Sequence, residues 1–194
     1  MVKMKIFRNS KISTNYKKSA IAIGNFDGVH NGHRKVFEQA KKFAKINRTK
    51  FGILTFSPLP VMFFNKKLIN YKLTSENKKF ILFKKYGVDF VINIKFNRNF
   101  SKINAEKFIK NIIYKKINPK RVFVSNNFRF GYKRKGNVTL LKRFENRCDY
   151  KLLKISPQKH RKKIVSSTRI RKLIQNGNIN LANKLLSRTW FIDG

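Results

Sequence analysis

Two histidines three residues apart, His30 and His33, stand in the segment GNFDGVHNGH at residues 24–33. An apolar run precedes this segment and an amphipathic stretch follows, so the sequence predicts a strand, a turn and a helix that begins near Asn31 or Gly32. Backbone N–H groups and the dipole at a helix N-terminus bind anions, and glycines allow a phosphate to approach closely. Imidazole N–H groups at this position could bind a polyphosphate.

A zinc site is one alternative for a histidine pair. Zinc needs three or four ligands, whereas the rest of the chain offers only His160, Cys148 and eight acidic residues, with no metal-ligand spacing. We therefore expect no metal site made of protein ligands. A further alternative, two polar residues at a helix start without any ligand, stays open on this segment alone.

A second segment with possible chemistry is VSSTRIR at residues 165–171. Its three hydroxyl residues can cap a helix, and Arg169 and Arg171 then lie in the first turn. Cations at a helix N-terminus are unfavourable by up to about 1 kcal/mol, which favours a bound anion that compensates them. Guanidinium groups bind phosphate in a bidentate manner. An ordinary capped helix explains the segment equally well.

The elements that must position these residues alternate between strands and helices. Strand-like runs lie at residues 19–25, 51–56, 89–94, 121–125 and 150–155. Helical stripes lie between them, with Val36, Phe37, Ala40, Phe43 and Ala44 in the first, Phe80, Ile81 and Phe83 in the second, and Phe108, Ile109, Ile112 and Ile113 in the third. N-cap signals precede the second stripe at Thr74 or Ser75 and the third at Asn104. The alternation predicts a mostly parallel sheet with helices on both faces, and ligands bind such sheets at the carboxyl ends of strands.

Charge is the most unusual feature of the composition. Forty-seven Lys and Arg against 8 Asp and Glu give a formal net charge of +39 over 194 residues. One interpretation is that the surface binds nucleic acid. The other is a compositional bias toward lysine, which is favoured because the lysines are dispersed rather than clustered. Loose RNA binding follows in both cases. No apolar run approaches the roughly 20 residues of a membrane helix and no signal peptide is present, so we predict a cytoplasmic protein without a membrane partner.

Five segments together resemble one known family. GNFDGVHNGH resembles the GxFDGxHxGH motif of the HxGH nucleotidylyltransferase superfamily, and SSTRIR resembles its SSTxIR motif. LTFSPLP at 54–60, VSNNFRFGYKRKG at 124–136 and GNINLANKLLSRTWFIDG at 177–194 are similar to segments of the FMN adenylyltransferase (FAD synthetase) module of bacterial bifunctional riboflavin kinase/FMN adenylyltransferase. This resemblance implies an α/β, Rossmann-like doubly wound sheet with a small flap near 126–137.

The resemblance also implies the site residues. Catalytic positions are His30, His33 and Arg169. ATP-site positions are Gly24, Phe26, Asp27, Gly28, Asn127, Ser167 and Thr168. FMN-site positions are Pro58, Pro60, Phe64, Phe128 and Arg129. Mg²⁺ is expected to accompany ATP without dedicated protein ligands. Asp27 could equally be a turn residue that holds the loop, and the prolines and phenylalanines could equally serve packing.

The expected reaction is ATP plus FMN to FAD plus pyrophosphate. We expect a nucleotidylyltransferase domain at 1–187 and a short remnant at 188–194 where the family's kinase domain begins; its PTAN-type motif is absent, so FMN should not form from riboflavin. Leu59, Ser125 and Ser187 replace the family's His, Gly and Gly, which affects the expected flavin contacts. The alternatives are another HxGH nucleotidylyltransferase or a basic RNA-binding protein on a decayed fold. The sequence predicts no particular oligomeric state.

Overall fold

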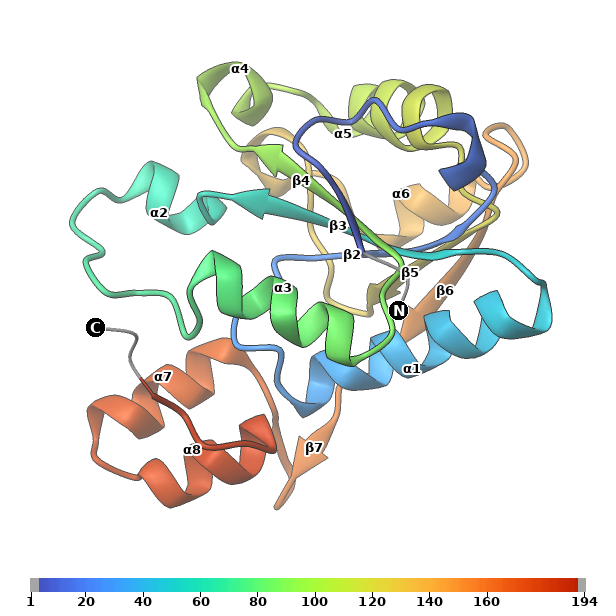
Figure 1. Cartoon of the computed structure of the whole chain (residues 1–194). Coiled ribbons are helices and arrows are strands. Elements are labelled where there is room, and N and C mark those ends of the chain that lie inside the picture. Colours follow the sequence, from blue (N-terminus) through green and yellow to red (C-terminus); the bar gives the residue numbers. More distant parts are fainter. Residues whose placement is uncertain (1–3, 192–194) are drawn as a thin grey trace.

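A six-stranded parallel sheet lies at the centre of the computed structural model, which describes residues 4–191 (Figure 1). Its strands are β1 (Lys5–Phe7), β2 (Ala20–Ile23), β3 (Phe51–Ser57), β4 (Phe90–Lys95), β5 (Arg121–Ser125) and β6 (Lys151–Ile155). The five predicted strands are confirmed, and every pairing in this sheet is parallel. The edge strand β1 was not predicted, because three residues carry too little periodicity. Residues 192–194 of the expected remnant at 188–194 lie outside the described residues.

In the strand order β1-β4-β3-β2-β5-β6, successive strands are added on one side of β2 up to β4 and on its other side from β5 onward. Ala22 pairs with Ile53 of β3 on one side and with Phe123 of β5 on the other. The chain therefore runs from β2 outward to β4 and then crosses to β5 on the opposite side. Ligands bind open α/β sheets at such a switch point, outside the carboxyl ends of the strands. The segment with His30 and His33 begins directly after β2 and so lies at this point.

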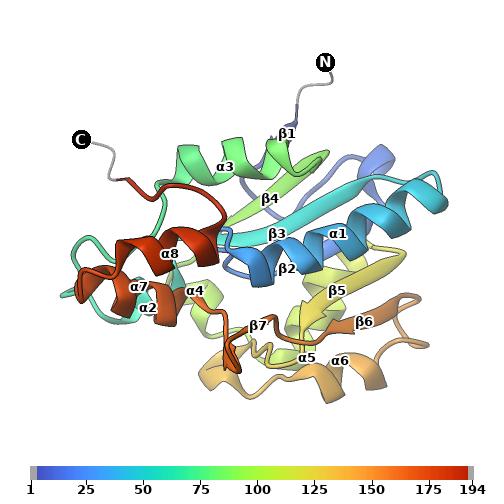
Figure 2. The ribbon, with the colours of Figure 1, turned by 90° about the horizontal axis from the view of Figure 1, so that it is seen from below.

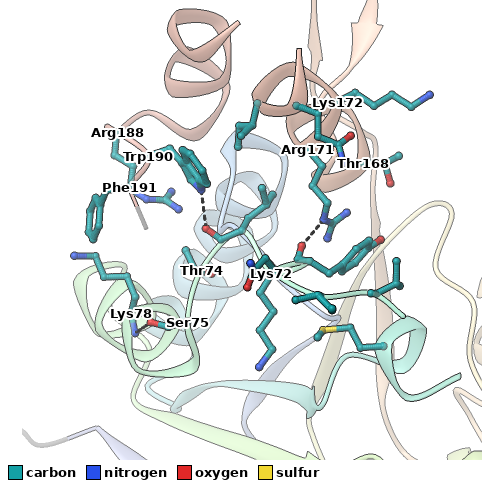
Figure 3. A pocket seen from close by; sticks show the side chains of 18 of the residues that line it. Lys72, Thr74, Ser75, Lys78, Thr168, Arg171, Lys172, Arg188, Trp190 and Phe191 are labelled. Carbon is teal, nitrogen blue, oxygen red and sulfur yellow. Dashed lines mark hydrogen bonds between the residues drawn. The ribbon is translucent and has the colours of Figure 1, made fainter. Parts of the chain in front are cut away.

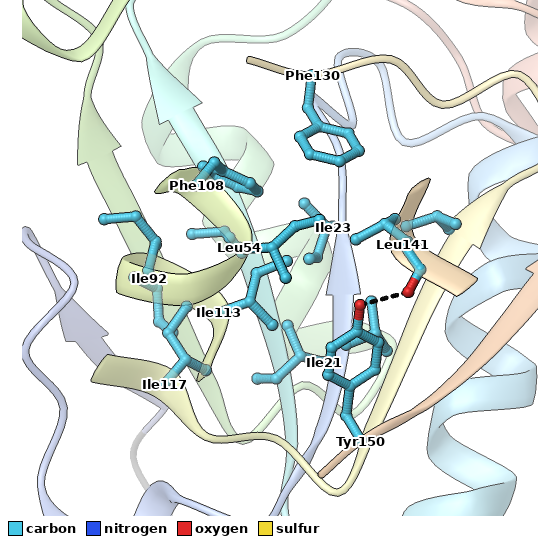
Figure 4. Close-up of a cluster of buried hydrophobic side chains, with 14 of the residues drawn as sticks. Ile21, Ile23, Leu54, Ile92, Phe108, Ile113, Ile117, Phe130, Leu141 and Tyr150 are labelled. Atoms are coloured by element: carbon cyan, nitrogen blue, oxygen red, sulfur yellow. Dashed lines mark hydrogen bonds between the residues drawn. The ribbon is translucent and has the colours of Figure 1, made fainter. Parts of the chain in front are cut away.

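Helices cover both faces of the sheet (Figure 1). One face carries α1 (Asn31–Ile46) and α3 (Glu76–Lys85), and the other carries α5 (Ala105–Lys107), its π-helical continuation η2 (Phe108–Ile117) and α6 (Val138–Arg143). Each face has its own hydrophobic cluster, with Phe37 and Phe83 buried in the first and Ile109 and Ile113 in the second. In the second cluster the Tyr150 hydroxyl donates to the Leu141 carbonyl at 2.6 Å (Figure 4). The predicted doubly wound α/β architecture is thereby confirmed.

Side-chain direction on α3 differs from the prediction at one position. The expected apolar stripe included Ile81, but Ile81 is 61% exposed, while Leu82 is buried. With 3.6 residues per turn, packing of Phe80, Leu82 and Phe83 against the sheet leaves Ile81 on the opposite side of α3. The four consecutive apolar residues Phe80–Phe83 did not reveal this rotation.

The chain after β6 forms a small hairpin and two helices at the N-terminal end of α1 (Figure 2). These elements are β7 (Lys159–His160), β8 (Lys163–Ile164), α7 (Ser167–Gln175) and α8 (Ile179–Leu186). A third hydrophobic cluster joins both helices to Leu73 and Trp190. The Asn31 side chain donates to the Lys184 carbonyl at 3.2 Å and so attaches α8 to the start of α1. The second motif therefore lies beside the first.

Four short elements complete the described chain: α2 (Pro60–Phe64), α4 (Arg98–Ser101) and the 3-10 turns η1 (Thr14–Tyr16) and η3 (Tyr132–Arg134). The turn η3 belongs to the flap at residues 126–137. In the flap, Phe130 is buried and forms an antiparallel bridge with Gly136. Across the described part of the chain, no helix is both long and apolar enough to cross a membrane.

Gly52 of β3 tests the packing of the sheet. A Cβ added there would lie 2.3 Å from the ring of Phe90, which is fully buried and cannot move aside. We expect Gly52→Ala to lower the free energy of unfolding by about 2–3 kcal/mol in urea titrations. Gly177→Ala is the control, because that Cβ meets nothing within 4 Å and only the positive φ of 71° is unfavourable, at about 1 kcal/mol. Equal losses in both variants would contradict the packing described.

Candidate functional site

The loop between β2 and α1 has an unusual backbone. Phe26, Gly28 and Val29 all have positive φ values, of 50°, 79° and 41°. Glycine adopts positive φ values readily, but a β-branched residue such as Val29 is strained there by about 1–3 kcal/mol. Packing compensates the strain, since Phe26 and Val29 are 4% and 0% exposed. The Phe26 ring also lies against Gly24, where a Cβ would be 3.0 Å from it.

His30 and His33 form a stacked pair at the start of α1. His30 is the N-cap residue, and its Nδ1 accepts a hydrogen bond from the His33 backbone N–H at 3.3 Å. The two rings are 3.6 Å apart with an interplanar angle of 18°. Since Nδ1 of His30 is an acceptor, the neutral ring carries its proton on Nε2. Nε2 of His30 is thus a donor for a ligand.

Both histidines are neutral at pH 7. Burial lowers the pKa of His30 to about 4, against a raising effect of a backbone hydrogen bond, and Arg188 and Arg171 lower it further. Burial also lowers the pKa of His33 well below its usual value, with His30 and Lys79 acting in the same direction. Nδ1 of His33 is buried without a hydrogen-bond partner among the described residues. The pair therefore offers uncharged imidazoles rather than two fixed cations.

Asp27 joins the first motif to two distant segments. Its carboxylate oxygens accept the Leu73 N–H at 3.0 and 3.2 Å, and Oδ2 also accepts from Nη2 of Arg171 at 2.6 Å. Its main-chain carbonyl accepts from the Ser167 hydroxyl at 2.9 Å. The Asp27 and Arg171 side chains are only 5% and 13% exposed. The carboxylate thus holds the loop through side-chain hydrogen bonds, as the turn interpretation of Asp27 anticipated.

Arg169 points toward the β7–β8 hairpin. Its backbone N–H donates to the N-cap residue Ser166, and its Nη1 donates to three main-chain carbonyls. These belong to His160 at 3.3 Å, Lys163 at 2.9 Å and Ile164 at 3.4 Å. Arg171, in contrast, is compensated by Asp27. Arg171, the fifth residue of α7, lies beyond the first turn, contrary to the expectation. Partners within the chain account for both arginines, so the helix dipole gives no argument for a bound anion.

The expected flavin residues follow the carboxyl ends of β3 and β5. Pro58 and Pro60 lie at the start of α2, the Ser57–Pro58 peptide is cis, and Phe64 is 69% exposed. On the flap, the rings of Phe128 and Phe130 stack at 5.4 Å.

The three departures from the family motifs have distinct local environments. Leu59 is buried, whereas Ser125 is half-buried and donates its hydroxyl proton to Oδ1 of the exposed Asn127 at 2.8 Å. Ser187 ends α8 with a left-handed φ of 50°, the conformation for which glycine is preferred. Its hydroxyl donates to Oδ1 of Asn31 at 2.6 Å. Ser187 is therefore less favourable than glycine in this backbone conformation, but its hydroxyl adds a hydrogen bond to the start of α1.

Lys79 is a buried cation that the sequence analysis missed. It is 6% exposed, and its Nζ donates to the Thr55 hydroxyl at 3.4 Å. Burial lowers its pKa, although Asp27 and Glu76 act in the opposite direction. The sequence offered one signal for this burial: Lys79 lies on the same face of α3 as Phe80 and Phe83. Arg171 was likewise visible as the last residue of the second motif, but nothing in the sequence revealed its partner.

A cavity lined by neither His30 nor His33 lies between the second motif and the chain before α3. It has a volume of about 760 Å³ and is bounded by the chain between α2 and α3, by α7 and by residues 188–191 (Figure 3). Among the expected site residues, only Thr168 lines it. Within residues 4–191, no group of three or more His, Cys, Asp or Glu side chains could hold a metal ion.

The family model described as FAD synthetase matches residues 12–169. The chain belongs to the FAD synthetase family. The bifunctional riboflavin kinase/FMN adenylyltransferase of Buchnera aphidicola subsp. Schizaphis graminum is 41% identical over 98% of the chain, and the Escherichia coli K12 protein of that description is 29% identical over 90%. The chain spans 62% and 56% of these two relatives.

Solved structures agree with this family on the fold. A structure described as a macrolide-efflux protein from Streptococcus pneumoniae has a TM-score of 0.82 and 26% identity, and covers 97% of this chain and 60% of its own. Pantoate-beta-alanine ligase from Francisella tularensis has a TM-score of 0.59 at 14% identity, over 95% of this chain and 78% of its own. The second likeness shows the Rossmann-like fold alone. In this FAD synthetase family chain, the two motif segments thus meet at the switch point of a shared fold.

The lowered pKa of His30 predicts a loss of stability in acid. The unfolded chain binds a proton near pH 6.5 but the folded chain only near pH 4, so stability falls as the pH drops through this window. We expect a loss of about 2 kcal/mol from His30 between pH 6.5 and 5. Urea unfolding at a series of pH values measures it. His30→Asn keeps an N-cap group without titrating there, so its curve should be flatter by that amount; parallel curves would contradict the assignment.

The Asp27–Arg171 pair predicts strong coupling between the two motifs. Arg171→Gln leaves a buried carboxylate without its cation and should lower the free energy of unfolding by about 3 kcal/mol. Asp27→Asn combined with Arg171→Gln should lose about 2 kcal/mol less than the sum of the single variants. The exposed Lys18–Asp149 pair is the matched control, with a coupling of about 0–1 kcal/mol. A double-mutant cycle with equal couplings for both pairs would refute the role given to Asp27.

Proposed function

We propose that this chain transfers the adenylyl group of ATP to FMN, forming FAD and releasing pyrophosphate. One observation carries the proposal: the histidine loop at the switch point is bonded through Asp27 to Ser167 and Arg171 of the second motif. Membership of the FAD synthetase family supports the same reaction. Relatives longer than this chain are described as bifunctional, so the substrates and activity stated here are proposals for these 194 residues.

The reaction needs positioning more than acid–base chemistry. A phosphate oxygen of FMN attacks the α-phosphorus of ATP and forms a new P–O bond. The bond from the α-phosphorus to the oxygen bridging to the β-phosphorus breaks, and pyrophosphate leaves with that electron pair. The FMN phosphate is already anionic at neutral pH, so no general base is required. In-line alignment and N–H donors directed at the developing charge supply the rate enhancement.

The ATP phosphates are proposed to bind at the start of α1. There His30 would donate from Nε2, and His33 would lie beside it with its unpartnered Nδ1. Gly24, Phe26, Asp27 and Gly28 would shape the loop, while Asn127, Ser167 and Thr168 would complete the nucleotide site. Neutral imidazoles suit this task because they bind phosphate through hydrogen bonds without holding the product pyrophosphate as strongly as fixed cations.

FMN is proposed to bind between α2 and the flap, both of which follow the carboxyl ends of strands. Pro58, Pro60 and Phe64 would line one side, and Phe128 and Arg129 the other. Phe64 contacts the rings of Phe63 and Phe96 but is 69% exposed, so part of its ring is accessible to a flavin. Arg169 is proposed as a positioning residue that holds the hairpin beside α7 rather than as a direct phosphate ligand.

Mg²⁺ is proposed to enter with ATP. Described acidic side chains form no metal cluster, and Asp27 is occupied by Arg171 and Leu73. The phosphate oxygens and water would therefore hold the ion, whose contribution is to neutralise phosphate charge. The dispersed positive charge is also proposed to give loose, salt-sensitive binding of nucleic acid.

The test is to incubate the purified 194 residues with ATP and Mg²⁺, and with either FMN or riboflavin, and to resolve the flavins by chromatography. We expect FAD from FMN and no product from riboflavin, in keeping with an adenylyltransferase domain over 1–187. His30→Ala should lower kcat/KM by about 100-fold because a donor to the phosphates is lost. His160→Ala is the control and should remain within about twofold of the parent.

Two outcomes would contradict the proposal. One is the absence of FAD from a folded chain, with CTP or another acceptor used in its place, which would favour another HxGH nucleotidylyltransferase. The other is an unchanged rate in His30→Ala, with circular dichroism confirming a fold equal to that of the parent.

A further inference from the structure

The cavity of about 760 Å³ has a lining of one charge sign. Six cationic side chains line it, namely Lys67, Lys72, Lys78, Arg171, Lys172 and Arg188, and no acidic residue occurs among the described residues of its wall. Of these, Arg171 is already paired with Asp27. Lys72 and Lys172 are exposed and line the cavity from different elements, one from the chain before α3 and one from α7 (Figure 3). The interior is thus strongly attractive to an anion.

Aromatic rings line the same space. Trp190 is fixed by a hydrogen bond from its Nε1 to the Leu73 carbonyl at 3.2 Å. The Tyr71 ring lies 3.7 Å from the guanidinium carbon of Arg171, and Nζ of Lys78 lies 4.2 Å from the Phe191 ring centroid. Flat apolar surfaces and cations therefore alternate along the wall. A ligand with an aromatic ring and a negatively charged group matches this pattern.

Arg188 adds a polar group that lacks a partner. Its Nη1 donates to the Leu186 carbonyl at 3.3 Å, but its Nη2 is buried with no acceptor among the described residues. A buried guanidinium donor left unsatisfied is unfavourable by about 1–3 kcal/mol. Arg188 lines the cavity beside Trp190 and Phe191 (Figure 3). A ligand oxygen at the inner wall would supply the missing acceptor.

We propose that this cavity is a second ligand site, which binds a phosphorylated aromatic molecule of nucleotide size. Its ring packs against Trp190 and Tyr71, and its phosphate lies among Lys72, Lys172 and Arg188. The site is distinct from the histidine pair, because neither His30 nor His33 lines it. Leu73 donates its N–H to Asp27 and accepts from Trp190 at its carbonyl. The proposal does not depend on the FMN adenylyltransferase activity.

Trp190 makes the site directly observable, because it is the single tryptophan of the chain. AMP is the first probe, and its binding should quench Trp190 fluorescence in a saturable titration at physiological ionic strength. Adenosine and inorganic phosphate should each bind at least about tenfold more weakly, since each supplies half of the recognition. FMN is the second probe, followed through the same quenching of Trp190 and not through its own anisotropy, which would also report the proposed FMN site; riboflavin is its unphosphorylated control. The two arms decide whether the natural ligand is an adenine or a flavin nucleotide.

Matched variants separate this site from general attraction to a basic protein. Lys72→Glu with Lys172→Glu should weaken the binding of the better probe by about tenfold or more. Lys115→Glu with Lys116→Glu makes the same change of net charge on η2, outside the cavity, and should change affinity by less than about twofold. His30→Asn should leave the Trp190 signal intact. All four lysines are exposed, so these substitutions preserve the fold.

The proposal is overturned if neither probe saturates, if both lysine pairs weaken binding equally, or if His30→Asn abolishes the Trp190 response. The last result would mean that the nucleotide is bound at the histidine pair alone. Loss of FAD formation together with an intact Trp190 titration would refute the adenylyltransferase proposal and leave this one standing.

Discussion

The buried contact of Asp27 with Arg171 and Leu73 is the interaction on which the site depends. Arg171 lies 144 positions after Asp27, and the contact fixes the loop after β2 against α7. The loop alone is unfavourable, since it contains Phe26 and Val29 at positive φ. Strain of this kind persists only where the surroundings determine the backbone. The carboxylate contributes to that determination by accepting N–H donors from two segments, which the hydrophobic cluster of Leu73 with α7 and α8 also holds together.

Burial gives the histidine pair its chemical character. In water two histidines would be partly protonated near neutral pH, and the high net charge of the chain would favour the neutral form only slightly. Within the structure, stacking at 3.6 Å and loss of solvent lower both pKa values, and nearby Arg188, Arg171 and Lys79 reinforce the effect. The two histidines at the start of α1 therefore offer hydrogen bonds rather than positive charge. The nearby positive charges belong to Arg188, Arg171 and Lys79. We propose that such an arrangement orients the phosphates of ATP through hydrogen bonds.

Much of the fold could be predicted from sequence, and the reason is local. Strand-length apolar runs separated by amphipathic helices specify a parallel sheet, and five strands occur at the predicted positions. The start of α1 at Asn31 was also predictable, because glycines and a polar turn precede an amphipathic stretch. The rotation of α3, which exposes Ile81 and buries Lys79, was not, since four consecutive apolar residues from Phe80 to Phe83 do not define a single helix face. Contacts such as Arg169 with the hairpin carbonyls link positions whose relation appears only in three dimensions.

The central claim is that the histidine pair is the place where ATP phosphates bind. The chain has three histidines, so ¹⁵N NMR of histidine-labelled protein gives three resolvable side chains, and His160 on the hairpin serves as an internal reference. Titration with ATP and Mg²⁺ should shift the ring nitrogens of His30 and His33 with one common saturation curve, the proton of His30 remaining on Nε2. A saturated complex in which only His160 responds, or no histidine does, would contradict the account.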